Sequence, residues 1–171
     1  MDSTDDATEA FPLVDEDGRR VGIATRGACH ADPALLHPAV HVLVRTADGL
    51  LWQLRGHRKD VAPGVCDHAC AGHVRPDEAP VDTAVRELGE ELGLAVDGAE
   101  LHEIGVVVVR LPNESELTTI FELRHDGPFV LAPPEVAGLA VLPFGVRPTP
   151  LPPGAPEVHA WLDEHRPGWD R

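Results

Sequence analysis

Residues 86–94 read RELGEELGL. In a helix, Glu87, Glu90 and Glu91 lie three and four residues apart and share one face. Like charges at that spacing repel by about a few tenths of a kcal/mol per pair, and Arg86 is the only cation within the stretch to offset them. Three glutamates alone are more often a solvated helix face. Despite the repulsion between them, the three glutamates also form the oxygen-rich surface that Mg²⁺ or Mn²⁺ prefers.

The same glutamates belong to a longer pattern. Gly72 is followed after five residues by Glu78, and after seven more by the stretch that begins at Arg86 and ends with Gly93-Leu94. Gly93 fits the end of a helix. The helix itself is predicted over Val81–Leu92, because its apolar residues recur at helical spacing. This apolar stripe consists of Val81, Ala84, Val85, Leu88 and Leu92, and it predicts that the glutamates point away from the core.

The rest of the chain reads mainly as strands. Two hairpins are predicted, over 11–26 with a DEDG turn and over 41–55 with a turn at 47–49. Residues 56–79 read mostly as loop. Further strands are predicted over 103–111, 117–124 and within 134–144, and a closing helix over 157–165. We therefore expect an α/β protein with a mixed sheet covered by helices, in a single domain over 11–171 that follows a disordered acidic tail over 1–10.

Composition limits the partners. The chain has 171 residues, 43% of them hydrophobic, and a formal net charge of −15. This charge repels nucleic acids and anionic membranes, so neither is an expected partner. Three cysteines are too few for a disulfide framework, and no leader or membrane-spanning stretch is recognisable, so we expect a cytoplasmic protein. The sequence leaves the oligomeric state open.

The full pattern from Gly72 to Leu94 resembles the box of the Nudix hydrolase superfamily, with every specified position filled. With seven fixed residues, a chance match in this chain is below about one in a million. The resemblance implies a loop-helix-loop that binds metal within a Nudix-type α/β/α sandwich. It also implies hydrolysis of a small-molecule diphosphate with Mg²⁺ or Mn²⁺, because metals neutralise charge on phosphate oxygens. Glu87, Glu90 and Glu91 are then metal ligands, with Glu90 as ligand or base.

The stretch from about Val14 to Val141 resembles the isopentenyl-diphosphate isomerase branch of this superfamily. That branch builds a second metal centre from two early histidines, a histidine after the box glycine, and two glutamates in an E-x-E. The matching residues here are His30, His37, His73, Glu114 and Glu116, with Glu116 also a catalytic candidate. Imidazole and carboxylate together suit a transition metal such as Mn²⁺ or Zn²⁺. Arg55 and Lys59 match positions that bind the diphosphate in that branch.

Two departures favour hydrolysis over isomerisation. The isomerases carry a catalytic cysteine two residues before the motif histidine, where this chain has Ala71, and Cys70 lies one residue away. A one-residue shift in extended chain moves a side chain to the opposite face. Their partner tyrosine is also absent, because the chain contains no tyrosine. The isomerases' own box is degraded, whereas this one is complete.

Two other interpretations remain open. Cys66, His68, Cys70 and His73 lie within eight residues and resemble a compact structural zinc site, although a distant second ligand pair is missing. A catalytically silent module that only binds a diphosphate metabolite is the third functional class. It is disfavoured because silent members of the superfamily typically lose box glutamates.

Overall fold

One buried strand organises the molecule. The computed structural model describes residues 6–171, and its central strand β3 (Leu36–Arg45) is buried along nearly its whole length. The other elements, in chain order, are β1 (Ala10–Val14), β2 (Arg20–Thr25), α1 (Arg26–Cys29), β4 (Leu50–Arg55), β5 (Cys66–His68), β6 (Cys70–His73), α2 (Pro80–Leu92), the 3₁₀ turn η1 (Gly98–Glu100), β7 (His102–Arg110), β8 (Ser115–Arg124), β9 (Val136–Leu142) and α3 (Ala155–His165).

The strands form a mixed sheet around β3. Its strand order is β5-β4-β3-β8-β7, with β6 also paired to β3 and β9 paired to β4, while β1 and β2 form a separate hairpin. β8 runs parallel to β3 along ten residue pairs, and the remaining pairings are antiparallel. Mixed pairing of this kind is frequent in sheets that carry helices on their faces. It brings the middle of β3 next to both β6 and β8, which carry His73 and Glu116.

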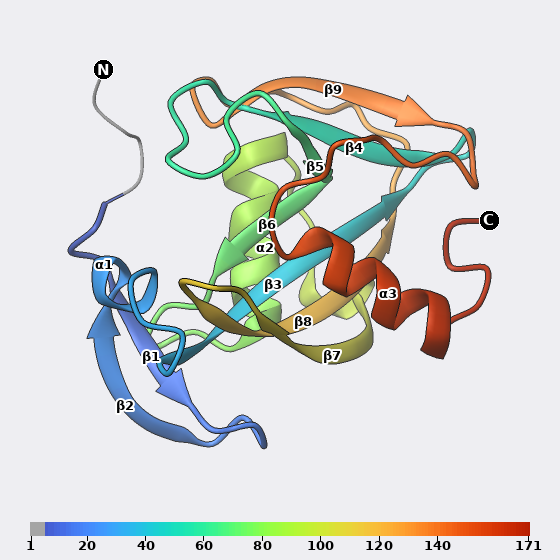
Figure 1. Cartoon of the computed structure of the whole chain (residues 1–171). Coiled ribbons are helices and arrows are strands. Elements are labelled where there is room, and N and C mark those ends of the chain that lie inside the picture. The colour runs from blue at the N-terminus through green and yellow to red at the C-terminus, as the bar shows by residue number, and fades with distance from the viewer. Residues whose placement is uncertain (1–5) are drawn as a thin grey trace.

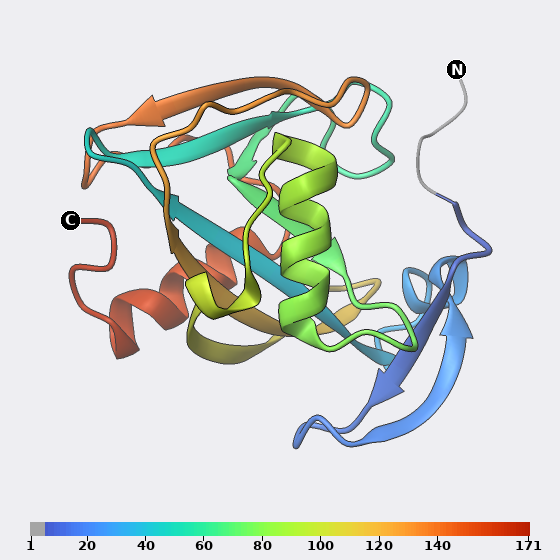
Figure 2. The ribbon, with the colours of Figure 1, turned by 180° about the vertical axis from the view of Figure 1, so that it is seen from behind.

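Helices cover opposite faces of this sheet. Alternate residues of a strand point to opposite faces, so Val40, Val42 and Val44 of β3 pack toward α2, in the same cluster as Leu88 and Leu92. On the other face Leu43 packs with Val158 and Leu162 of α3. Figure 1 shows α3 in front of the sheet, and Figure 2, turned by 180°, shows α2 in front of it. The α/β/α sandwich expected from the sequence is confirmed.

Most predicted elements lie where the sequence placed them. The helix that carries Glu87, Glu90 and Glu91 is α2, which begins at Pro80 and ends at Leu92. Gly93 caps it in the left-handed conformation with φ 66°. The sequence interpretation missed β5 and β6, which lie inside the stretch 56–79 that reads as loop. These two strands are only three and four residues long and rich in polar residues. They are strands because β4 and β3 offer them partners, not because of their own periodicity.

The predicted disordered tail falls partly outside the described residues, at positions 1–5. Over residues 6–10 the structure differs from that prediction. The backbone carbonyls of Ala7 and Glu9 accept hydrogen bonds from the N–H groups of Gly27 and Arg26, at 2.9 and 2.7 Å, and β1 begins at Ala10. Contact with α1 orders these polar residues. Within the described part of the chain, no helix has the length and apolar character needed to cross a bilayer.

Gly105 provides a test of how α3 packs on β7. A Cβ atom added at Gly105 lies only 1.9 Å from the Trp161 ring of α3, so Gly105→Ala displaces the helix or its tryptophan. We expect a loss of about 1–3 kcal/mol in the free energy of unfolding, as overpacked cores show. Gly138→Ala in β9 is the control, because its Cβ meets Leu54 at an ordinary 3.7 Å. Urea unfolding that gives the two variants equal stability contradicts this packing.

Candidate active site

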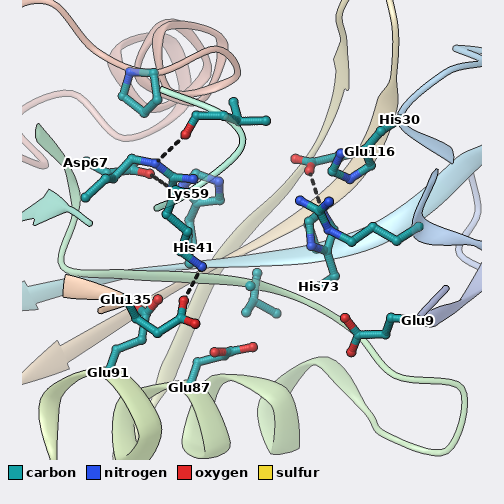
Figure 3. A pocket seen from close by; sticks show the side chains of 18 of the residues that line it. Glu9, His30, His41, Lys59, Asp67, His73, Glu87, Glu91, Glu116 and Glu135 are labelled. Carbon is teal, nitrogen blue, oxygen red and sulfur yellow. Dashed lines mark hydrogen bonds and ion pairs between the residues drawn. The ribbon is translucent and has the colours of Figure 1, made fainter. Parts of the chain in front are cut away.

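A cavity of about 540 Å³ opens beside α2, and most of the residues that line it are polar or charged. Nine of the ten site residues predicted from the sequence line it: His30, Arg55, Lys59, His73, Glu87, Glu90, Glu91, Glu114 and Glu116. The tenth, His37, is fully buried, with its Nε2 4.0 Å from Glu116 Oε1. Figure 3 shows Glu87 and Glu91 rising from α2 on one side, with His30, His73 and Glu116 grouped on another. Tertiary structure thus collects residues that lie up to 86 positions apart in sequence.

Arg86 binds three of the box glutamates at once. Its guanidinium donates to Glu78 at 2.8 and 3.1 Å, to Glu87 at 2.7 Å and to Glu90 at 3.0 Å. Glu78 is in turn fixed by the Thr83 hydroxyl, which donates to it at 2.7 Å. Glu78 therefore acts through Arg86, whereas Glu87 and Glu90 also line the cavity. Arg86 offsets part of the repulsion that the sequence implied.

Glu91 is buried, and this corrects the prediction that the glutamates point away from the core. Its side chain accepts a hydrogen bond from Gln53 Nε2 at 3.0 Å and another from the Cys70 thiol. Burial, with the nearby charge of Glu87, raises the pKa of Glu91 to about 8. Burial also raises the pKa of Glu87, against the opposing effect of Arg86. The reason is helical geometry: Glu87 and Glu91 directly precede Leu88 and Leu92, so they border the apolar stripe.

Gly72 makes room for Glu87. A Cβ atom at this position would lie 2.3 Å from Glu87 Oε1 and 2.5 Å from its carboxyl carbon. The box glycine is thus required by a neighbouring carboxylate rather than by its own backbone conformation. Gly89 differs, since a Cβ there meets only the Leu94 carbonyl, at an ordinary 3.5 Å. Nothing in the structure explains why Gly89 is a glycine.

The three predicted histidines form a second group. The ligand nitrogens of His30, His37 and His73 lie within 4.8 Å of one another, as do potential ligand atoms of His37, Glu114 and Glu116. His30 Nε2 lies 3.3 Å from Glu114 Oε2, and His73 Nε2 lies 3.2 Å from Glu116 Oε1. Strand pairing creates this proximity, because His37 of β3 is in register with Glu116 of β8, and Ala39 with His73 of β6.

The atoms of this second group fit a metal ion. His30 Nε2, His37 Nε2 and Glu114 Oε2 are buried and have no hydrogen-bond partner among residues 6–171, which is costly unless something else binds them. His37 Nδ1 lies 3.2 Å from the Leu35 carbonyl. If Nδ1 carries the proton and donates it to this carbonyl, Nε2 has a free lone pair that is directed at the other members of the group. Burial lowers the pKa of His30 and of His37 to about 4, so both rings are neutral near pH 7, as ligands must be.

Glu116 supplies the negative charge of this group. Burial alone would raise its pKa, but the hydrogen bond and the charge of His73 outweigh that effect and lower the pKa to about 2. Glu114 shows the opposite shift, because burial and the adjacent Glu116 both raise its pKa. Glu116 is thus ionised at neutral pH. Two neutral imidazoles and an ionised carboxylate are a donor set suited to a divalent transition metal.

Comparison with known proteins places this geometry in a family. The profile of the NUDIX domain matches residues 35–162, most of the chain. The chain belongs to the Nudix family. An uncharacterised Nudix hydrolase of Rhodococcus erythropolis, orf19, is 37% identical over 140 residues, covering 77% of this chain and 75% of that protein. Isopentenyl-diphosphate delta-isomerase of Halorhodospira halophila is 35% identical over 155 residues, covering 90% of this chain and 78% of the relative.

A third relative aligns over a smaller part of its length. The isopentenyl-diphosphate delta-isomerase of Streptomyces griseus is 39% identical over 114 residues, which cover 66% of this chain but 57% of that isomerase. Solved structures agree on the fold. DR0079 of Deinococcus radiodurans superposes with a TM-score of 0.65 at 24% identity, covering 79% of this chain and 83% of that one. A MutT protein of Methanosarcina mazei Go1 gives 0.63 at 19% identity, covering 78% and 94%.

Within this Nudix fold, strand β6 assigns different faces to Cys70 and Ala71. Cys70 is fully buried in the cluster beneath α2 and bonds to Glu91, whereas Ala71 lines the cavity. Cys70 therefore does not occupy the place of the isomerase cysteine. The zinc interpretation of residues 66–73 fails for the same reason. Among the described residues, no cysteine belongs to a group with metal-ligand geometry.

The two predicted diphosphate-binding cations line the Nudix cavity and are held by acids. Arg55 donates to the Val61 carbonyl at 3.1 Å and to Asp67 Oδ2 at 3.0 Å. Lys59 forms an ion pair with Glu135, which precedes β9. The sequence interpretation missed both acids and also Gln53, the donor to Glu91. No motif marks these residues, since each is defined by its position in the folded sheet rather than by spacing along the chain.

The box glycines allow a matched test of the Glu87 site. Gly72→Ala is expected to move the Glu87 carboxylate and to weaken Mn²⁺ binding at the box about 10- to 100-fold, the range seen when the support of a metal ligand is lost. Gly89→Ala is the control, because its Cβ has room. Isothermal titration with Mn²⁺, with thermal unfolding alongside, measures both. Equal Mn²⁺ affinity in the two variants would show that Glu87 does not depend on Gly72.

Proposed function

We propose that this Nudix protein is a metal-dependent hydrolase that cleaves a diphosphate linkage in a small molecule. The observation that carries the proposal is a single cavity lined by three box glutamates, Glu87, Glu90 and Glu91, together with Arg55 and Lys59. Carboxylates supply oxygen ligands for Mg²⁺ or Mn²⁺, and the two cations suit phosphate oxygens. The orf19 relative, named a Nudix hydrolase, supports the same reaction class.

The side chains divide the work of hydrolysis among them. Arg55 and Lys59 bind and orient the diphosphate, since their acidic partners fix both cations at the cavity wall. Glu87 and Glu91 would hold Mg²⁺ or Mn²⁺, which neutralises charge on the phosphate oxygens. Glu90 has a 54% exposed side chain, and its carboxylate, which also binds Arg86, can hold a further metal ion or orient the attacking water. The second group, with Glu116, would hold a transition metal such as Mn²⁺ or Zn²⁺.

A hydrolase of this kind acts on soluble metabolites. The charge of −15 supports a small-molecule diphosphate over nucleic acid or an anionic membrane as partner. Cys29, Cys66 and Cys70 are free thiols, which supports a reducing compartment and hence the cytoplasm.

A panel of diphosphate compounds, assayed with Mg²⁺ or Mn²⁺ for release of phosphate and pyrophosphate, tests the function. We expect the wild type to hydrolyse at least one compound, and Glu91→Gln to lower kcat by orders of magnitude because a metal ligand is lost. Near-wild-type turnover of Glu91→Gln at saturating Mg²⁺ contradicts the assignment. Binding of a compound without phosphate release in either metal would support the silent binding module instead.

The folding control for Glu91→Gln follows from the raised pKa of Glu91, about 8. Between its usual pKa and about 8, the unfolded chain holds fewer protons than the folded one, so this carboxyl lowers stability as pH rises. An amide does not ionise and removes that loss. Thermal unfolding at pH 8 should therefore find the metal-free Glu91→Gln protein at least as stable as the wild type. A lower Tm of Glu91→Gln would mean that its lost activity comes from unfolding and not from a missing metal ligand.

Isomerisation of isopentenyl diphosphate is the second candidate function. The assembled group of His30, His37, His73, Glu114 and Glu116 favours it, as do relatives named isomerases. Against it, Ala71 presents no thiol to the cavity and the chain has no tyrosine. Incubation with isopentenyl diphosphate in D₂O distinguishes the two functions. Deuterium in the recovered allylic carbons supports the isomerase, and its absence beside phosphate release supports the hydrolase.

The two groups of ligands should behave as separate metal sites. Imidazole favours Mn²⁺, Zn²⁺ or Co²⁺ over Mg²⁺, so we expect the purified protein to carry a transition metal in the histidine group. His37→Ala and His73→Ala should each remove it, whereas Glu91→Gln should retain it. Elemental analysis of the three variants measures this. Unchanged metal content in both histidine variants would show that these side chains hold no metal.

A further inference from the structure

Three further histidines, which are not part of the His30/His37/His73 group, are linked in a row by contacts between their ring nitrogens. His41 of β3, His68 of β5 and His159 of α3 come from three different elements and are all buried. His41 Nδ1 lies 2.5 Å from His68 Nδ1, and His68 Nε2 lies 2.9 Å from His159 Nε2. The middle ring therefore uses both of its nitrogens, one toward each neighbour.

These distances indicate hydrogen bonds rather than metal ligation. Potential ligand atoms of His41, Asp67 and His68 do lie within 4.8 Å of one another. Two nitrogens bound to one tetrahedral metal at about 2.0–2.1 Å, however, lie about 3.3 Å apart. The 2.5 Å between His41 and His68 is shorter than that, which favours a shared proton over a common metal. Asp67 is already engaged, since Arg55 donates to it at 3.0 Å.

The surroundings keep the rings of His68 and His159 uncharged. His68 stacks on Trp52, and His159 lies against Trp169 with ring centroids 5.0 Å apart. Burial lowers the pKa of His68 well below its usual range, and it lowers that of His159 to about 4. Each of these rings therefore carries one proton near pH 7 and can donate from only one nitrogen.

If His41 also carries a single proton, counting protons leaves two arrangements of the three rings. Each nitrogen–nitrogen contact needs one proton, and His68 supplies the proton of only one contact. If His68 donates to His159, then His41 donates to His68 from Nδ1 and its Nε2 is an acceptor. If His68 donates to His41, then His159 donates to His68 and Nε2 of His41 carries a proton. The two arrangements satisfy both contacts and differ only in direction.

Each end ring of this histidine series has one nitrogen outside the two contacts. His41 lines the cavity, as Figure 3 shows, and Nε2 is the polar atom that it has left to offer there. At the other end, His159 of α3 keeps its Nδ1 outside the two nitrogen–nitrogen contacts. A proton accepted at one end can thus be matched by a proton released at the other.

We propose that His41, His68 and His159 form a proton relay that connects the cavity to the α3 side of the molecule, with His41 as a further catalytic residue. The relay rests on the proposed hydrolysis. Water attacks phosphorus and gives its proton to His41 Nε2 as the P–O bond of the linkage breaks. The Nδ1 proton of His41 passes to His68 Nδ1, the Nε2 proton of His68 passes to His159 Nε2, and the Nδ1 proton of His159 leaves to solvent. The rings end neutral, each in its other tautomer.

The alternative is a polar core that only fastens α3 to the sheet. Both roles predict that the contacts exist, so the decisive difference is proton transfer during turnover. A fastening role changes stability when a ring is replaced and leaves kcat of the folded protein unchanged. A relay role changes kcat in a variant that still folds.

The first measurement needs no substrate. In protein labelled with ¹⁵N-histidine, we expect NMR to find scalar coupling across both nitrogen–nitrogen contacts, with one proton on each ring. His159→Gln should remove the His68–His159 coupling. His165→Gln is the control and should retain that coupling. His165 lies on the same helix but is not one of the three linked histidines, and its Nδ1 lies 2.9 Å from the Trp161 carbonyl. Absence of coupling in the wild type overturns the relay, whatever the enzyme hydrolyses.

The second measurement uses the best diphosphate from the panel. Glutamine at position 159 can still bond to His68 but cannot pass a proton on, so His159→Gln should lower kcat about a hundredfold with KM little changed. His165→Gln should keep wild-type kcat, and thermal unfolding checks that both variants fold. Undiminished kcat in folded His159→Gln overturns the relay. A wild type that shows both couplings but releases no phosphate refutes the proposed hydrolysis, and with it the relay's role.

Discussion

The pairing of β3 with β8 and β6 is the constraint on which the rest of the structure depends. β3 is buried on both faces, so its backbone polar groups must be satisfied within the sheet. Ten parallel pairs with β8 and four antiparallel pairs with β6 meet that demand and fix the register of all three strands. A slip of one residue would turn His37 and His41 to the opposite face. Register therefore determines where His37, His41 and His73 lie.

Burial then sets the charge of the side chains that this register brings together. His30 and His37 are held neutral and Glu91 favours its protonated form, while Glu116 stays ionised through His73. Burying ionisable groups in an apolar fold is unfavourable unless partners compensate. Such groups are typical of sites that bind ions or transfer protons. The two proposed metal groups and the histidine chain share this property and surround or adjoin one cavity.

One argument for our proposal of hydrolysis over isomerisation comes from the alternation of a single strand. In β6, Cys70 turns toward α2 and Ala71 toward the cavity, so the thiol bonds to Glu91 and faces away from the cavity. Relatives under both names resemble this chain at similar identity, so overall similarity does not separate the two activities. The position of one side chain relative to the sheet carries more weight than that similarity.

The sequence by itself determined the fold class, the box helix with its Gly93 cap, and ten candidate site residues, because these signals are local or have fixed spacing. Tertiary structure alone decided that β5 and β6 are strands, that Glu91 is buried, and that Gly72 yields space to Glu87. It also decided that His41, His68 and His159 meet, although 118 positions separate the first from the last. Such features arise from packing between elements distant in sequence, and no local pattern encodes them.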